Sequence, residues 1–181
     1  ADHPERVASV ALFGAGGRVP AEAEASAALA TVLWSGATGE ELVDAVRTAM
    51  FAPGNDVPPE WITGWDGALA RVQSQAGAAT DVASWWLGAP DARMLVVQGL
   101  EDRMALPANG RSLAEALGSR VTLRETTPMG HAMVPEQPGW LASAGWASLR
   151  HRREPSFLPG PCQRLLEGAQ HLPPRPLRAA S

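Results

Sequence analysis

Residues 93–138 alternate between strand-like and helix-like patterns, and this alternation limits the possible folds more than any other feature of the sequence. Two short strand-like runs, residues 93–98 and 121–125, are separated by residues 107–117, whose apolar side chains recur at helical spacing. Strands that alternate with helices form parallel sheets joined by right-handed crossovers. The pattern therefore predicts an α/β fold with parallel strands.

A carboxylate and an imidazole follow these two strand-like runs. Asp102 closes the sequence G-L-E-D after the first run, and His131 closes P-M-G-H after the second. Taken alone, each is also explained as an ordinary loop residue. Because the carboxyl ends of parallel strands meet at one edge of a sheet, we expect the two side chains to lie together. In a catalytic triad, an Asp orients a His that acts as the general base. Asp102 and His131 are therefore candidates for these two roles.

An almost continuous apolar run, residues 7–13, predicts another strand, one that is buried on both faces as in a parallel sheet. It ends in a glycine cluster at residues 14–17. Glycines after a strand can bind phosphate, but the spacing here matches neither G-x-G-x-x-G nor the P-loop. A tight strand exit near a pocket is the favoured interpretation, and a nucleotide site the alternative.

The sequence between residues 20 and 90 has helical patterns only. Helices are expected over residues 21–34, after Thr38 as N-cap, over 60–75 and from Thr80, with a loop at 52–59. Five of the seven Trp residues lie in this segment. They are expected either to pack helices together or to form an apolar lid over a substrate pocket.

Composition narrows the function classes. The chain has 181 residues, 45% of them hydrophobic, and a net charge of −4, which favours a packed domain and disfavours nucleic-acid or membrane surfaces. No apolar run is long enough to span a membrane, and no signal peptide is visible. The single cysteine, Cys162, fits a reducing compartment, so a cytoplasmic location is expected.

No metal site is indicated around the cysteine or the N-terminal histidine. Neither Cys162 nor His3 has neighbours at metal-ligand spacing. No role is assigned to His151 or His171.

The motifs resemble the C-terminal part of the α/β-hydrolase family. Within residues 94–138, a strand, G-L-E-D, a helix, a strand, P-M-G-H and P-E-Q-P follow one another as they do there. Residues 1–17 resemble the segment after the family's nucleophile elbow, where a helix ends at H-P-E-R-V and a strand follows. The resemblance covers residues 1–150. It implies a partial hydrolase core of three parallel strands at 1–19 and 91–150, an all-helical cap at 20–90, and a disordered Pro/Arg-rich tail at 151–181.

The resemblance also implies an activity. It implies a cofactor-free hydrolase of small-molecule esters or related bonds, with Asp102 as triad acid and His131 as general base. Glu101 is the weaker candidate for the acid. The family's nucleophilic serine lies on G-x-S-x-G, and this sequence contains no such motif. The resemblance places it just before Ala1, so we expect the C-terminal portion of a longer hydrolase, inactive alone.

Other nucleophiles in the chain are poor substitutes for that serine. The candidates lie inside a strand, in the helical segment or in the tail: Ser9, Ser35, Ser74, Ser84 and Cys162.

A second hypothesis is a non-catalytic half. Such a chain would complete a hydrolase in trans, or bind apolar ligands as a pseudoenzyme. Three strands alone leave the edge of the first strand and both apolar faces undercovered, which favours association. The expected partners are therefore a small apolar or ester-like substrate and a further polypeptide or second copy at the sheet edge, with no nucleic acid or membrane.

Overall fold

The computed structural model describes residues 3, 6–81 and 92–150, and no helix in this part of the chain combines the length and apolar character needed to cross a membrane. The elements in chain order are β1 (Ser9–Phe13), α1 (Ala23–Ala30), the π-helical turn η2 (Thr31–Ser35), α2 (Gly39–Met50), the 3-10 turn η3 (Pro59–Ile62), α3 (Gly67–Ala78), β2 (Arg93–Gly99), α5 (Pro107–Leu117), the 3-10 turn η4 (Gly118–Arg120), β3 (Val121–Thr126), α6 (Met133–Glu136) and α7 (Pro138–Arg150). Several expectations lie outside the described residues: the tail after 150, the helix with Trp85 and Trp86, Ser84 and Cys162.

The three strands form one parallel sheet in the order β1-β2-β3, which confirms the predicted α/β fold. Phe13 pairs with Val97, and Gly99 pairs with Thr126. The carboxyl ends of all three strands therefore lie along one edge. α5 spans the predicted helix, and Gly118 ends it with a φ of +58°, a conformation that favours glycine.

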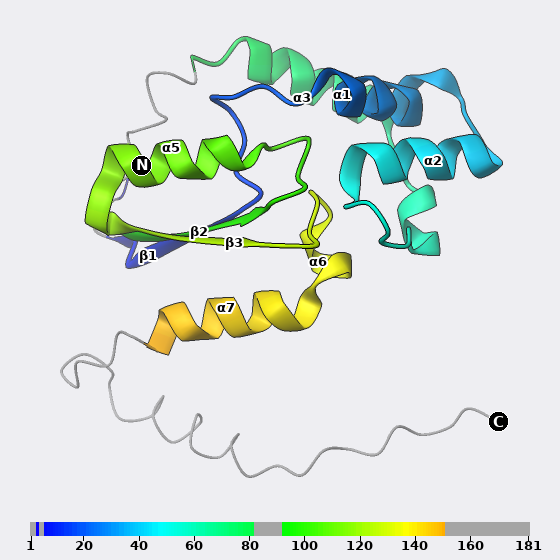
Figure 1. The fold of residues 1–181 in the computed structure, drawn as a ribbon. Coiled ribbons are helices and arrows are strands. Elements are labelled where there is room, and N and C mark those ends of the chain that lie inside the picture. The colour runs from blue at the N-terminus through cyan, green and yellow to red at the C-terminus, as the bar shows by residue number, and fades with distance from the viewer. Residues whose placement is uncertain (1–2, 4–5, 82–91, 151–181) are drawn as a thin grey trace. The chain divides into compact units, whose positions relative to one another are not determined.

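β2 is the core of the sheet, since residues 94–99 are all buried. Val96 and Gln98 face α5, which approaches closely at Gly110. Leu95 and Val97 face the other way and cluster with side chains beyond β3 and from the start of α7 (Met129, Met133, Trp140 and Leu141). Figure 1 shows α5 and α7 on opposite sides of the sheet. Both faces of β2 are thus covered by helices.

The expectation that the first strand is buried on both faces is wrong. β1 alternates exposed and half-buried residues, and Phe13 is 48% exposed. The reason is that β1 is an edge strand, which pairs only with β2 among the described residues. The strand that is buried on both faces is β2.

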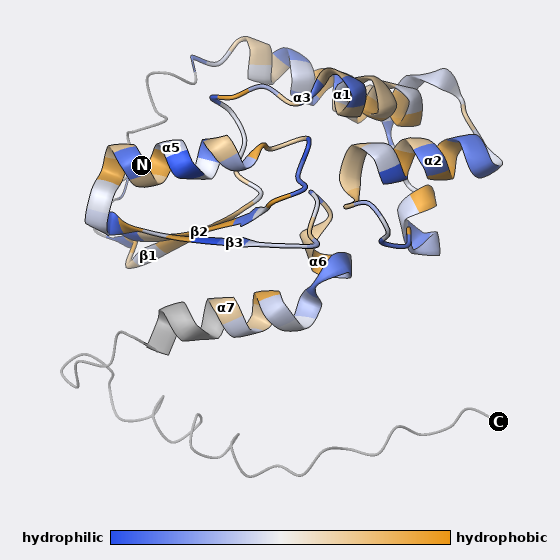
Figure 2. Ribbon diagram, viewed as in Figure 1, coloured by the Kyte–Doolittle hydropathy of each residue, from blue (hydrophilic) through white to orange (hydrophobic). Residues whose placement is uncertain are grey.

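The helical insertion, defined here as residues 20–81, has its own apolar cluster. Val46, Ala49, Met50 and Phe51 from the end of α2 are its buried centre, and Leu29, Val32 and Trp61 pack around them. Figure 2 shows both hydrophilic and hydrophobic residues on α2, and its buried residues recur at the three- and four-residue spacing of one helix face. Ala132, next to His131, belongs to the same cluster, so the insertion packs against the loop that follows β3.

Two expectations for the insertion need correction. Residues 60–75 do not form one helix, because Gly64 adopts a φ of +78° and Asp66 starts α3 by accepting hydrogen bonds from Ala68 and Leu69 N–H. Thr38 does precede α2, but its side chain makes no capping hydrogen bond. The first departure depends on the backbone conformation of Gly64 and the second on the orientation of one side chain, and apolar periodicity reports neither.

Gln98 and Asn109 are fully buried polar residues that hold the chain after β1. Gln98 Oε1 accepts from Ala15 N–H at 2.8 Å, and its Nε2 donates to Ala105 O at 2.9 Å. Asn109 Oδ1 accepts from the N–H groups of Arg18 and Val19 at 3.0 and 2.7 Å. A buried amide satisfied in this way fixes loop geometry, because no water can replace the partners that the loop supplies to it.

We expect Gln98→Met to lower the free energy of unfolding by about 2–4 kcal/mol, because it leaves the half-buried N–H of Ala15 and the buried carbonyl of Ala105 unpaired. Urea denaturation followed by circular dichroism measures the change. Gln73→Met, the same substitution at an exposed position of α3, serves as control and should change stability by less than about 0.5 kcal/mol. Equal effects at the two positions would contradict this account.

Candidate active site

Asp102 lies just beyond the carboxyl end of β2 and is 1% exposed. Its Oδ1 accepts hydrogen bonds from the N–H groups of Met104 and Ala105 at 2.9 and 2.7 Å. These two donors stabilise a charged carboxylate away from water and orient it. The second oxygen, Oδ2, is left for another partner.

That partner is His131, in the loop after β3. Oδ2 of Asp102 and Nδ1 of His131 are 3.0 Å apart. The imidazole is 35% exposed, and within the described residues its Nε2 has no hydrogen-bond partner. The structure therefore brings the two predicted residues together, with one ring nitrogen held by a carboxylate and the ring accessible.

Glu101, the weaker candidate for the acid, has a different set of contacts. Its Oε2 accepts a hydrogen bond from Met129 N–H at 3.0 Å, and its Oε1 accepts one from the hydroxyl of Thr127. Its own N–H donates to Met129 O at 3.1 Å. Glu101 therefore holds the turn that leads to His131, and Asp102 is the carboxylate at the imidazole.

Glycines allow the two loops to meet. A Cβ on Gly99 would lie 2.1 Å from Met129 O, and a Cβ on Gly130 would lie 2.6 Å from Ala52 N. Gly14, at the exit of β1, has a φ of +60° and lies against the His131 ring, where a Cβ would be 3.3 Å from Nδ1. The glycine cluster after β1 is thus a tight strand exit beside the candidate site.

Glu136 is a site residue to which sequence reasoning gave no role, although the P-E-Q-P that contains it was part of the resemblance. Its Oε2 accepts from Gly130 N–H at 2.7 Å. Its Oε1 accepts from Ala52 N–H at 2.6 Å and from Asn55 Nδ2 at 2.7 Å. Its place in P-E-Q-P, close to His131, was the sequence signal, but its partners from the insertion are remote in sequence.

Arg103 makes a second polar link between the strand edge and the insertion. Its guanidinium binds the carboxylates of Glu24 and Glu22, and its carbonyl accepts from Glu22 N–H at 2.9 Å. The hydrogen bonds to Glu24 and then Glu22 raise the pKa of Arg103 above its ordinary value. The residue after Asp102 is therefore tied to the chain that enters α1.

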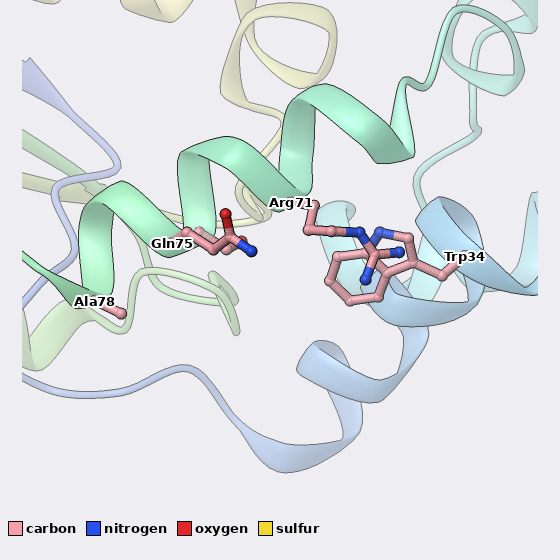
Figure 3. A pocket seen from close by; sticks show the side chains of 5 residues that line it. Trp34, Arg71, Gln75 and Ala78 are labelled. Atoms are coloured by element: carbon pink, nitrogen blue, oxygen red, sulfur yellow. The ribbon is translucent and has the colours of Figure 1, made fainter.

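A cavity of about 440 Å³ lies in the insertion between η2 and α3, and Figure 3 shows its lining side chains. Arg71 lies over the Trp34 ring, 5.9 Å from its centroid, and Ser74, Gln75 and Ala78 complete the lining. Neither Asp102 nor His131 lines it, so this cavity is separate from the candidate site. Trp61 and Trp65 instead pack edge-on within the insertion, so different Trp residues of this segment have different surroundings.

Neither a metal cluster nor a nucleophile accompanies the pair in the described part of the chain. No group of three His, Cys, Asp or Glu side chains there is arranged to hold a metal ion. No serine hydroxyl of residues 6–81 and 92–144 forms a hydrogen bond with His131. The arrangement can orient an imidazole as a base, but the group that it would deprotonate is not among its contacts.

Neither a protein-family model nor a curated protein matches this chain. Solved structures do share its fold. A thermophilic esterase from Thermogutta terrifontis is 18% identical with a TM-score of 0.60, over 82% of this chain and 58% of that one. Naproxen esterase from Bacillus subtilis is 16% identical with a TM-score of 0.56, over 82% and 53%. The 2-hydroxy-6-oxo-6-phenylhexa-2,4-dienoate hydrolase from Rhodococcus is 20% identical with a TM-score of 0.58, over 83% and 57%.

This chain thus spans only 53–58% of the length of those three structures. At these identities the likeness concerns the fold. A parallel sheet of three strands with helices is the part of that fold which this chain has. The chain has the C-terminal part of the α/β-hydrolase fold.

Proposed function

We propose that Asp102 and His131 supply the acid–base pair of a serine hydrolase site that cleaves small-molecule esters or related bonds. The observation that carries the proposal is the 3.0 Å contact between Asp102 Oδ2 and His131 Nδ1 at aligned strand ends. The shared fold supports it, because solved structures with that fold include esterases.

In the proposed reaction, His131 Nδ1–H donates to Asp102, so that Nε2 can accept the proton of a serine hydroxyl. The serine oxygen then bonds to the ester carbonyl carbon, and Asp102 stabilises the imidazolium that forms. The imidazolium gives its proton to the departing alkoxide as the ester bond breaks. Water next attacks the acyl-enzyme with proton transfer to Nε2, and collapse returns that proton to the serine and frees the acid.

The serine is proposed to come from polypeptide outside these 181 residues, because the sequence has no G-x-S-x-G. The helical insertion is proposed to act as the cap of the completed site. A cytoplasmic location is proposed on the single cysteine, which cannot form an internal disulfide.

We expect the 181-residue chain alone to hydrolyse p-nitrophenyl acetate no faster than its His131→Ala variant, and to remain unlabelled by a fluorophosphonate probe. The reason is that the base has no serine to activate. Hydrolysis well above the variant, together with probe labelling, would contradict the proposed external serine.

The catalytic roles are tested in the polypeptide extended through the coding sequence upstream of Ala1. We expect Asp102→Asn and His131→Ala each to lower kcat by about 10³–10⁴-fold with p-nitrophenyl acetate, as loss of a triad member does. Glu101→Gln serves as control and should act mainly on stability, since Glu101 contacts the turn and not the imidazole. An upstream frame without G-x-S-x-G, or full activity of Asp102→Asn, would sink the proposal.

A second candidate function is a non-catalytic half that associates through its open sheet edge or binds an apolar ligand. The observation that favours association is β1, an edge strand whose Phe13 is 48% exposed. Unpaired backbone groups and an exposed aromatic ring on an edge strand are features that other chains can cover. The cavity between η2 and α3, which Trp34 lines, offers space for an apolar ligand.

If this second candidate holds, the chain should elute as a dimer or larger species in size-exclusion chromatography with light scattering. Phe13→Glu should shift it to monomer, because a charge on the edge strand opposes pairing. Leu69→Glu is the matched control, since Leu69 is 54% exposed but lies on α3. A monomeric wild-type chain that unfolds cooperatively would argue against self-association.

A further inference from the structure

We infer that Glu136 is a positioning residue that holds His131 against Asp102 by joining the histidine loop to the end of α2. The assignment rests on the proposed role of His131 as general base. The Glu136 side chain forms no hydrogen bond with His131 or Asp102, so it takes no part in the proposed proton transfers. Its action is on the backbone that carries the imidazole.

The two oxygens of the Glu136 carboxylate bind two different parts of the chain. Oε2 accepts from Gly130 N–H, the residue just before His131, at 2.7 Å. Oε1 accepts from Ala52 N–H at 2.6 Å and from Asn55 Nδ2 at 2.7 Å, both in the loop after α2. One charged group therefore bridges the histidine loop and the insertion with three charge-assisted hydrogen bonds.

These three donors are what stabilise the carboxylate. Glu136 is half-buried and has no cationic partner within the described residues. A partly desolvated carboxylate needs hydrogen bonds to offset its lost hydration. Glutamine at this position would keep the shape, but its NH₂ group would face either Gly130 N–H or the donors from the insertion.

The other side of His131 is attached to the same segment. Ala132 N–H donates to Met50 O at 2.8 Å, and Ala132 lies in the apolar cluster around Met50 and Phe51. Gly130 has no room for a Cβ, which would lie 2.8 Å from Met50 O. The residues before and after His131 are therefore both fixed to residues 50–52.

This attachment sets the position of the imidazole. With its backbone fixed on both sides, the ring reaches Asp102 through side-chain torsions alone. A small shift of the loop would lengthen the 3.0 Å contact beyond hydrogen-bonding range. The end of α2 and His131 are also expected to move as one unit, so any opening of the insertion has to occur elsewhere in it.

The test measures the tautomer of His131, which fold stability alone does not set. The full 181-residue chain is labelled with ¹⁵N-histidine, and the imidazole ¹⁵N shifts are recorded at a pH where the ring is neutral. His131→Gln identifies the resonances. Wild type should show the Nδ1–H tautomer that donates to Asp102. In Glu136→Gln, we expect the share of the Nε2–H tautomer to rise about tenfold, the effect of losing a charge-assisted hydrogen bond.

Control variants separate this effect from general charge removal. Glu125→Gln removes a carboxylate that pairs with Arg111 away from the site, and it should leave the tautomer unchanged. Asn55→Ala removes one of the three donors and should give an intermediate change. An unchanged tautomer in Glu136→Gln, with Nδ1–H in wild type, would overturn the positioning role and leave the proposed function intact. An Nε2–H tautomer in wild type would instead overturn the Asp102–His131 pair, and with it both proposals.

A measurement on wild type keeps the inference testable if Glu136→Gln fails to fold. Hydrogen exchange at the Gly130 amide reports the bond to Glu136 directly. We expect that amide to exchange at least about a hundredfold more slowly than an exposed amide. Exchange at the rate of an exposed amide would contradict the inference.

Discussion

The candidate site depends on the close approach of Gly99 to the backbone of Met129 and Gly130 at the carboxyl edge of the sheet. A Cβ at Gly99 would lie 2.1 Å from Met129 O, so any other residue would push the two loops apart. The approach lets Glu101 N–H donate to Met129 O at 3.1 Å. With the two loops joined there, Asp102 lies within hydrogen-bonding distance of His131. Parallel register aligns the strand ends, and glycine permits the final approach.

Buried polar side chains specify the loops around this edge. Gln98, Asp102 and Asn109 are each almost fully buried, and each accepts hydrogen bonds from backbone N–H groups of a loop. Leaving a buried amide or carboxylate without its hydrogen-bond partner lowers the stability of the folded protein. These groups therefore select one loop conformation over others. The apolar residues of β2 stabilise the sheet, and the polar ones determine where the chain goes beyond it.

The helical insertion is attached to the strand edge by polar links and by apolar packing. Glu136 binds the loop after α2, and Arg103 binds the carboxylates of Glu22 and Glu24 before and within α1. The apolar cluster at the end of α2 includes Ala132, which follows His131. The pair of residues proposed for acid–base chemistry therefore depends on the insertion as well as on the sheet. In the proposed enzyme, changes in the insertion would reach the imidazole through this shared backbone.

The sequence alone determined the three strands, the helix Pro107–Leu117 and the shared edge for Asp102 and His131. These follow from local periodicity and from a rule of parallel sheets. It did not determine the exposure of Phe13, because burial of an edge strand depends on its neighbours in space. The break near Gly64 and the contacts of Glu101 depend on the conformation of single residues. Only the tertiary structure showed Glu136 bridging Gly130 and Ala52, because hydrogen bonds between residues far apart in sequence leave no periodic signal.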